Sequence, residues 1–309
     1  MKYTINQFRK EYPNDDVCLD AIFKMRYSQM PCCPQCHQET KFRRITGRRA
    51  YQCSDKDCQY QLYPTAGTVF EKTRTSLRDW FYAIYLMTST RNGVAAKELE
   101  RQLGVTYKTA WRMGHQIRKL MAETGLGTPL SGIVEADETY IGGKAGNKHK
   151  VQRTRYNMNA KGINSPNKVA VFAMLERNGN IKATIIPQAT TDIIAPIMNE
   201  NIKDGSKVIT DSWMAYNFLK RSSYKHTVVD HKNDQFTKGS KHTNSVEGFF
   251  SHLKRTIKGT HIKVSRKYMQ RYVDECAFKY VHRLKGQKMF DAILNRVWIY
   301  PLPLLKEQP

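Results

Sequence analysis

The sequence predicts an α/β domain, a mixed sheet flanked by helices, that follows a cysteine-rich ribbon and a helical module. Three observations lead to this prediction. Four closely spaced cysteines lie near the amino terminus, a stretch with helical periodicity follows them, and the second half of the chain alternates short apolar strands with helices. At 309 residues the chain is long enough for at least two domains.

The chain is strongly basic, with 51 lysines and arginines against 27 acidic residues and a formal net charge of +24. Such a field attracts polyanions, so nucleic acid is the first candidate partner and an anionic membrane surface the second. The longest apolar run, Trp80 to Met87, is far shorter than the roughly 20 residues that a spanning helix needs. We therefore expect no membrane insertion.

The amino-terminal residues MKYTINQFRKEY contain no apolar core of the kind found in secretory signals, so we expect a cytoplasmic protein. In a reducing compartment, cysteines bind metals more often than they form disulfides. The seven cysteines of the chain therefore indicate zinc.

Four cysteines have the spacing of a zinc ribbon. Cys33 and Cys36 form one pair, Cys53 and Cys58 form another, and the turn-forming Gly47 lies between the pairs. Each pair can form a knuckle whose thiolates converge on one Zn²⁺ at about 2.3 Å. The metal would supply folding energy that so short a segment cannot obtain from its core.

The choice of ligands within this cluster leaves alternatives open. Cys32 adjoins Cys33 and could replace it, and His37 could replace a thiolate. The alternative to a ribbon is a set of ordinary buried thiols, which is what we expect of Cys18 and Cys276.

Helical periodicity begins after the ribbon and extends from Thr75 to Met121. An amphipathic helix begins near Leu77. The stretch from Gly93 to Leu120 has one apolar face that breaks at Gly104 and resumes in phase, which is typical of a helix-turn-helix. Residues near the start of the second helix would then contact DNA, namely Tyr107, Lys108, Thr109 and Arg112. The alternative is a helical hairpin that links two domains.

The second half of the chain predicts five strands, at residues 132–142, 168–175, 181–186, 207–211 and 226–230. The second and third strands are joined by a hairpin turn. Helices are expected at residues 191–202, 213–219 and about 244–258. A mixed sheet flanked by helices fits this order, and such sheets place their active sites at strand ends.

Three acidic side chains come from distant parts of this domain. Asp137 lies within the first strand, Asp211 ends the fourth, and Glu247 lies at one margin of the apolar stripe of the last helix. Clustered acids require cations, and three carboxylates suit two Mg²⁺ or Mn²⁺ ions about 4 Å apart in phosphoryl transfer. Asp137 would bridge both ions. Glu135 and Glu138 are close rivals to Asp137.

Two further residues of the last helix are candidates for the site. Lys254 follows Glu247 by two helical turns and returns to almost the same face, where it would touch a phosphate of the substrate. Asn244 could join the site, or it could cap the helix, a position at which Asn is favoured.

Two basic segments lie near these acids. The segment 142–167 is expected to be a loop that closes on DNA, or else a solvated insertion. In the segment 231–271 we expect the cations, Arg255 and Lys258 among them, to follow the phosphate backbone. The Pro-rich end from Pro301 to Pro309 is expected to fray.

At these residues the chain resembles the DDE transposases of bacterial insertion sequences, of the ISXO-like group with an amino-terminal zinc ribbon. The motifs that carry the resemblance extend over nearly the whole chain. They are the four ribbon cysteines, residues 65–70 (TAGTVF), 104–111 (GVTYKTAW), 135–143 (EADETYIGG), Thr210-Asp211, and 242–254 (HTNSVEGFFSHLK).

The resemblance implies a ribonuclease H-like catalytic fold with Asp137, Asp211 and Glu247 as the metal-binding triad. Lys254 would be the basic residue that is common seven positions after the glutamate. The resemblance also implies that the protein recognises terminal inverted repeats and that water cleaves a DNA strand there. The freed 3′ hydroxyl would then attack target DNA. A homodimer or larger assembly is expected, because two element ends are processed together.

We therefore expect four regions. They are a zinc-ribbon region at 1–70, a helix-turn-helix DNA-binding module at 71–126, a ribonuclease H-like catalytic domain at 127–262, and a helical extension and tail at 263–309. The alternatives to an active, nucleoid-associated transposase are a non-catalytic DNA-binding regulator or domesticated remnant, and a nuclease of the same fold that hydrolyses DNA but never joins it.

Overall fold

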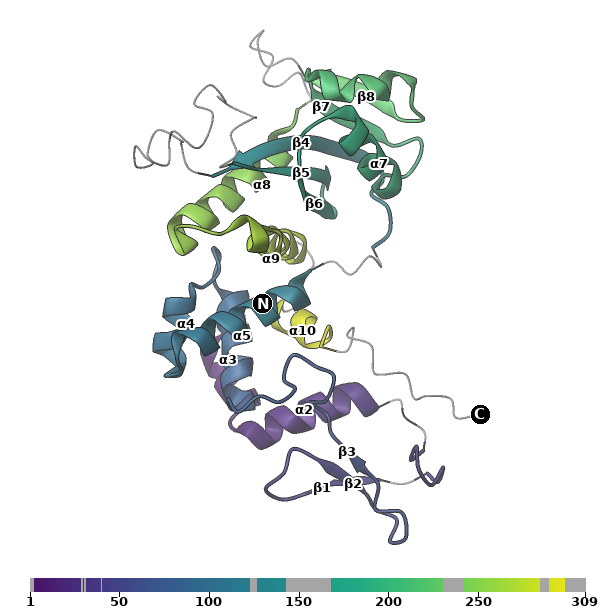
Figure 1. Ribbon diagram of the computed structural model, residues 1–309. Helices are drawn as coiled ribbons and strands as arrows, with labels where there is room; N and C mark the ends of the chain where they lie inside the picture. The colour runs from purple at the N-terminus through teal and green to yellow at the C-terminus, as the bar shows by residue number, and fades with distance from the viewer. Residues whose placement is uncertain are drawn as a thin grey trace. The chain divides into compact units, whose positions relative to one another are not determined.

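The computed structural model describes residues 3–28, 30, 32–39, 41–122, 127–142, 168–229, 242–283 and 289–297 (Figure 1). The chain divides into two compact units. One unit contains Met1–Leu120 together with Gly286–Pro309, and the other contains Met121–Lys285. The predicted loop, the first part of the second basic segment and the Pro-rich tail lie outside the described residues.

Two helices that the sequence analysis did not predict precede the ribbon. Helix α1 (Ile5–Glu11) begins with a capping box between Thr4 and Gln7, and in helix α2 (Asp15–Tyr27) the side chain of Asn14 accepts a hydrogen bond from the first turn. The capping residues Thr4 and Asn14 were the sequence signal from which both helices could have been predicted. Only Cys18, Leu19 and Ile22 are buried on α2, and charged residues occupy several of its remaining positions, so its apolar stripe is a weak signal.

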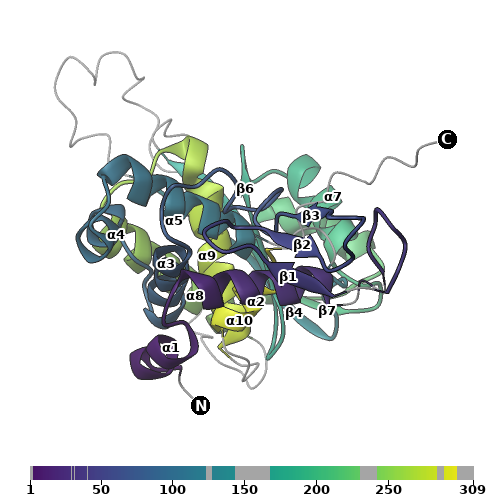
Figure 2. The same ribbon diagram turned by 90° about the horizontal axis from the view of Figure 1, so that it is seen from below.

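The ribbon consists of three short antiparallel strands, β1 (Phe42–Arg44), β2 (Tyr51–Cys53) and β3 (Gln61–Leu62), in the order β1-β2-β3. Helix α2 lies against this sheet (Figure 2). The ring of Phe23 on α2 stacks on Tyr51 of β2 with centroids 3.9 Å apart, and Arg44 of β1 pairs with Asp16 of α2 at 2.9 Å. The helix thus supplies apolar surface that the ribbon itself lacks.

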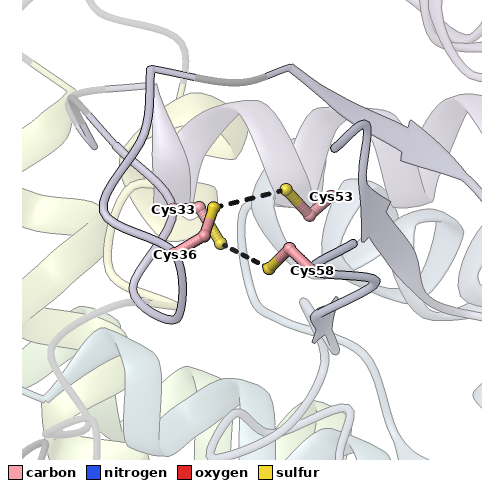
Figure 3. A group of neighbouring side chains, drawn as sticks. All are labelled: Cys33, Cys36, Cys53 and Cys58. Carbon is pink, nitrogen blue, oxygen red and sulfur yellow. Dashed lines mark hydrogen bonds between the residues drawn. The ribbon is translucent and has the colours of Figure 1, made fainter. Parts of the chain in front are cut away.

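The four ribbon cysteines point toward one another (Figure 3). The sulfur atoms of Cys33 and Cys58 are 3.7 Å apart, those of Cys36 and Cys53 are 4.0 Å apart, and all four lie within 4.8 Å of one another. A tetrahedral Zn²⁺ with bonds of about 2.3 Å requires sulfur separations of about 3.8 Å. The cluster therefore fits a structural zinc.

Neither alternative ligand belongs to this cluster. It contains Cys33, not Cys32, and His37 is not a member. His37 instead occupies the left-handed region with φ 57°, and its amide donates to the carbonyl of Cys33, so it helps to turn the first knuckle. Cys18 and Cys276 are buried outside the cluster, as expected for core thiols.

Three helices follow the ribbon in the same unit: α3 (Leu77–Ser89), α4 (Ala96–Leu103) and α5 (Tyr107–Met121). Helix α3 is largely buried, and Gly104, with φ 65°, ends α4 in the left-handed conformation that favours glycine. The break between two helices at Gly104 is confirmed. None of the described helices has the length and apolar character that crossing a bilayer requires.

The carboxyl-terminal helix α10 (Met289–Leu294) belongs to this amino-terminal unit and packs on α3. Its Phe290 is 1% exposed and lies in edge or tilted contact with the rings of Phe8, Phe81 and Tyr12. The core of the first unit is therefore completed by residues from the other end of the chain.

The second unit is built on a five-stranded sheet in the order β6-β5-β4-β7-β8. Its strands are β4 (Ile133–Ile141), β5 (Val169–Glu176), β6 (Ile181–Ile186), β7 (Lys207–Asp211) and β8 (Lys225–Val229). The first three pair antiparallel, whereas β4, β7 and β8 run parallel. The five predicted strands are confirmed, and this mixed sheet is consistent with a ribonuclease H-like domain.

Helices cover both faces of the sheet (Figure 1). Helix α7 (Thr191–Asn201) and the 3₁₀ helix η3 (Met214–Arg221) pack on the face that carries Val134 and Ala136. Helices α8 (Asn244–Arg255) and α9 (Met269–His282) pack on the opposite face, where Val171 and Ile141 are buried. Alternation along the strands thus separates two apolar layers.

Two predicted helices differ in detail. The helix expected at 213–219 is a 3₁₀ helix, Met214–Arg221, and its buried residues Tyr216 and Leu219 share one face. The helix expected to reach residue 258 is α-helical only to Arg255 and continues as a π-helical segment, Thr256–His261. Gly259 and neighbouring β-branched residues favour the α form weakly. A short 3₁₀ helix, Arg266–Tyr268, precedes α9.

We predict that Cys36→Ser removes zinc and unfolds the ribbon, because three thiolates bind the metal much more weakly than four and metal binding supplies the folding energy. Metal analysis of purified protein should give one zinc per chain before the change and little after it. Cys32→Ser is the matched control, since Cys32 lies outside the cluster. Full zinc occupancy in Cys36→Ser would contradict the assignment.

Candidate functional site

The parallel pairing of β4 with β7 brings two predicted site residues to the same level of the sheet. Ile133 lies opposite Lys207, and Glu135 lies opposite Ile209. Continuing this register by two residues places Asp137 opposite Asp211. Because Ala136 and Val208 belong to the core beneath α7 and η3, strand alternation directs both aspartates to the other face, toward α8.

The third predicted acid, Glu247, lies in the first turn of α8. Its backbone N–H donates to the carbonyl of Thr243, and its Oε1 accepts a hydrogen bond of 2.8 Å from the Thr243 hydroxyl. Glu247 is exposed, whereas the adjacent Val246 is fully buried in the core between α8 and the sheet. The carboxylate therefore lies at the margin of the packed face of α8.

The three acids interact electrostatically. Burial, the neighbouring charge of Glu138, and the charges of Asp211 and Glu247 raise the pKa of Asp137 from 3.8 to about 7. The backbone N–H of Glu138 donates to Asp137 Oδ1 at 2.8 Å and opposes this shift. Asp137 therefore lies within electrostatic reach of both other predicted acids.

The spacing of the acids differs from that of the cysteines. The ligand atoms of the four cysteines all lie within 4.8 Å of one another. Among the described residues, no group of three acids is as close. The acids are more widely spaced, which mutual repulsion favours. Oxygen donors of this kind suit hard divalent cations such as Mg²⁺ or Mn²⁺.

The two rivals to Asp137 have other partners. Glu138 lies on the opposite face of β4, where it accepts a hydrogen bond of 2.6 Å from the Tyr216 hydroxyl, and burial raises its pKa despite that bond. Glu135 is fully buried and accepts hydrogen bonds from Arg177 and from the first turn of α8. Their sequence positions do not distinguish the three acids, whereas these partners do.

The structure also places the other candidates on α8. Asn244 is the first residue of the helix and is exposed, whereas Thr243 occupies the N-cap position, so the interpretation of Asn244 as the cap is wrong. Lys254 is exposed two turns after Glu247 on continuous α-helix. Arg255 ends α8, and the exposed Lys258 lies in the π-helical segment, which changes its direction relative to the α-helical register.

The predicted DNA contacts of the first unit lie at the start of α5. Tyr107, Lys108 and Arg112 are exposed there, and Thr109 is half-buried with its hydroxyl 3.1 Å from that of Thr106. The ammonium of Lys97 on α4 lies 5.2 Å from the centre of the Tyr107 ring, so the two helices present positive charge together.

Sequence analysis did not identify two residues that support the site. Trp213 directs its backbone N–H to Asp211 Oδ1 at 3.0 Å, and Arg177 contacts Glu135 at 2.6 Å. Trp213 follows Asp211 closely, so its proximity was readable from the sequence. Arg177 lies in the hairpin turn between β5 and β6, and only the folded structure brings it to β4 and α8.

Two family models match this chain. Residues 129–280 match the family described as the ISXO2-like transposase domain, and residues 13–61 match the transposase zinc-ribbon domain. A protein of the transposable element ISH50 from Halobacterium salinarum is 26% identical over 295 residues, which cover 93% of this chain and 98% of that protein.

A transposase-like protein from Haemophilus influenzae is 23% identical over 100 residues, or 32% of this chain and 80% of that protein. The two family matches account for the ribbon and for the sheet that holds the acids. The chain therefore belongs to the insertion-sequence transposases that combine an amino-terminal zinc ribbon with an ISXO2-like transposase domain.

Proposed function

We propose that this transposase binds the terminal inverted repeats of an insertion sequence and catalyses metal-dependent strand cleavage followed by attack of the 3′ hydroxyl on target DNA. The observation that carries the proposal is the β4–β7 register, whose continuation puts Asp137 and Asp211 on one face of the sheet. The charges of Asp211 and of Glu247 on α8 both raise the pKa of Asp137, which supports a shared site. DNA is the substrate and partner, in the cytoplasm at the nucleoid.

The acids would hold the cations and the neighbouring groups would hold the DNA. Bound Mg²⁺ or Mn²⁺ supplies charge neutralisation and an activated oxygen nucleophile. Asp137, Asp211 and Glu247 would hold the divalent cations through their carboxylate oxygens. The Trp213 amide fixes the direction of the Asp211 carboxylate, and the Thr243 hydroxyl fixes that of Glu247.

Basic residues outside the triad would position the DNA strands. Lys254, on the same side of α8 as Glu247, would contact a phosphate next to the scissile bond, with Arg255 and Lys258 following the backbone. Asn244, exposed one turn before Glu247, would border the same site. In the first unit, α4 and α5 would act as a helix-turn-helix whose second helix enters the major groove, and a dimer or larger assembly would bring two ends together.

We predict that Asp137→Asn abolishes strand cleavage and strand transfer, lowering both rates by at least about 10³-fold, because the central metal ligand loses its charge. The assay uses duplex DNA carrying the ends of the element with Mg²⁺ or Mn²⁺, and the products are sequenced. Glu200→Gln, which neutralises an exposed acid on α7, is the control and should keep its activity.

Three outcomes of this assay would change the proposal. Cleavage that persists in Asp137→Asn would remove the site assignment. Cleaved ends without covalent donor–target junctions in the wild type would identify a hydrolytic nuclease, and binding of the ends without cleavage would identify a regulator.

The same substitution has a predicted effect on stability. In the absence of divalent cations the folded chain keeps the Asp137 proton up to about pH 7, whereas the unfolded chain releases it near 3.8. The folded state thus binds more protons in this window, so the free energy of unfolding falls as pH rises from about 4 to about 7. Asp137→Asn lacks this loss and should be more stable than the wild type at pH 8 by roughly 1–4 kcal/mol.

Denaturant unfolding of zinc-loaded, magnesium-free protein at pH 4 and pH 8 measures this difference. The wild type and Asp137→Asn should converge at the lower pH and separate at the higher one. Glu200→Gln should follow the wild type at both. A difference between wild type and Asp137→Asn that does not change with pH would contradict the electrostatic explanation.

We predict that Lys108→Ala combined with Arg112→Ala weakens binding to the element ends and makes it less dependent on salt. Each lost phosphate contact should reduce the slope of log affinity against log salt by about 0.9. The matched control is Lys10→Ala with Lys24→Ala, which removes the same charge from exposed positions on α1 and α2. Equal effects of the two double variants would show that only net charge matters.

A further inference from the structure

Glu135 is a buried acid that the proposed chemistry does not use. It is 0% exposed and lies two residues before Asp137 on the same face of β4. A buried carboxylate is costly unless hydrogen bonds and an opposite charge compensate it. The partners of Glu135 therefore explain how the chain retains it.

Those partners connect β4 to the start of α8. Glu135 Oε2 accepts the backbone N–H of Ser245 at 2.8 Å and that of Val246 at 3.1 Å, and its Oε1 accepts the Ser245 hydroxyl at 3.1 Å. Thr243, the N-cap residue of α8, has no side-chain hydrogen bond to these amides. A strand residue from far back in the chain thus caps this helix, where an anion is favoured.

Arg177 makes the second half of the connection. Its Nε donates to Glu135 Oε1 at 2.6 Å, and its NH2 group donates to the carbonyl of His242 at 2.8 Å and lies 3.1 Å from the Nδ1 of that residue. The backbone N–H of Arg177 also donates to the carbonyl of Ile133 at the start of β4. One arginine therefore joins β4 and the residues that lead into α8.

Glu247 lies one residue beyond the amides that Glu135 accepts. Its carboxylate direction is set by Thr243, which lies between His242 and Ser245 in the same short segment. The chain from His242 to Glu247 is consequently attached to β4 beside Asp137 at several points. The apolar contacts of Val246 and Phe250 also hold α8 on the sheet and turn its apolar stripe inward, but such contacts are not directional, so the hydrogen bonds fix the first turn more closely.

We infer that the Glu135–Arg177 pair is a positioning device that sets the distance and direction of Glu247 relative to Asp137 for binding divalent cations. The inference rests on the proposed function, because it assigns a role toward the same metal site. Buried ion pairs add little net stability when compared with apolar replacements, so fixed geometry is the property that this pair supplies. Partners behind metal ligands commonly change metal affinity by about 10- to 100-fold.

The test compares Glu135→Gln and Arg177→Lys with Glu275→Gln. The last variant disrupts the Glu275–Lys279 pair, an ion pair of 2.9 Å within α9 that is also buried, and serves as the matched control for lost stability. Binding of Mn²⁺ to zinc-loaded, DNA-free protein is measured from the electron paramagnetic resonance signal of free Mn²⁺, and thermal unfolding is measured without Mn²⁺. Cleavage rates are then measured against Mn²⁺ concentration.

Glu135→Gln and Arg177→Lys should bind Mn²⁺ about 10- to 100-fold more weakly than the wild type. Their cleavage should require correspondingly more Mn²⁺ and recover at saturation, since the ligands themselves are intact. Glu275→Gln should lose thermal stability and keep its Mn²⁺ affinity within about twofold. Ser245→Ala removes the hydroxyl donor to Glu135 and keeps the backbone N–H groups of residues 245 and 246, so it should weaken Mn²⁺ binding less. This variant keeps the test decisive if Glu135→Gln does not fold.

Unchanged Mn²⁺ affinity in Arg177→Lys and Ser245→Ala, together with an unchanged Mn²⁺ requirement for cleavage, would overturn the inference and leave the proposed function in place. Equal Mn²⁺ binding by the wild type and Asp137→Asn would instead overturn the metal site, and the positioning role with it. The two failures are thus distinguished by the Asp137→Asn reference.

Discussion

The parallel pairing of β4 with β7 is the constraint on which the candidate site depends. It joins two distant parts of the chain and, because side chains alternate along a strand, it sets Asp137 beside Asp211 on the face that α8 covers. The apolar layers on both faces hold this arrangement, and α8 adds Glu247. The arrangement has an electrostatic cost, since a buried acid next to other acids resists ionisation. A strongly basic chain thus contains a small acidic centre.

The sequence predicted the elements of the second unit well because their signals are local. The strand Lys207–Asp211 is a short apolar run bounded by turn residues, and the hairpin around Asn178, whose φ is 59°, contains residues that tolerate the left-handed region. Strand order is not local, so the predicted cluster of Asp137 with Asp211 depended on the general rule that active sites lie at strand ends and on the resemblance to a known family. Alternation puts Glu135 and Asp137 on one face, and only the position of the first turn of α8 separates their environments.

Other features escaped prediction for physical reasons that differ. The main sequence signal for helix α2 is its N-cap residue, Asn14. Its position on the ribbon depends on tertiary contacts such as the stacking of Phe23 on Tyr51, which the sequence does not reveal. The change from α to π geometry after Arg255 occurs where Thr256 and Ile257 are buried, and hydrophobic periodicity over so few residues does not distinguish the two helix types. The role of Arg177 could not be predicted, because its contacts form only when the β5–β6 turn, β4 and the start of α8 come together.

The contact of Phe290 with Phe8 and Phe81 has a consequence for how the protein matures. Most of the first unit is synthesised before the second, yet its aromatic core is covered by α10, which leaves the ribosome only after the whole second unit. Domains generally fold as units in the order of synthesis, but the core of this one is complete only after α10 has been added. A polypeptide truncated before Met289 would leave these rings uncovered, and exposed apolar surface favours aggregation and proteolysis.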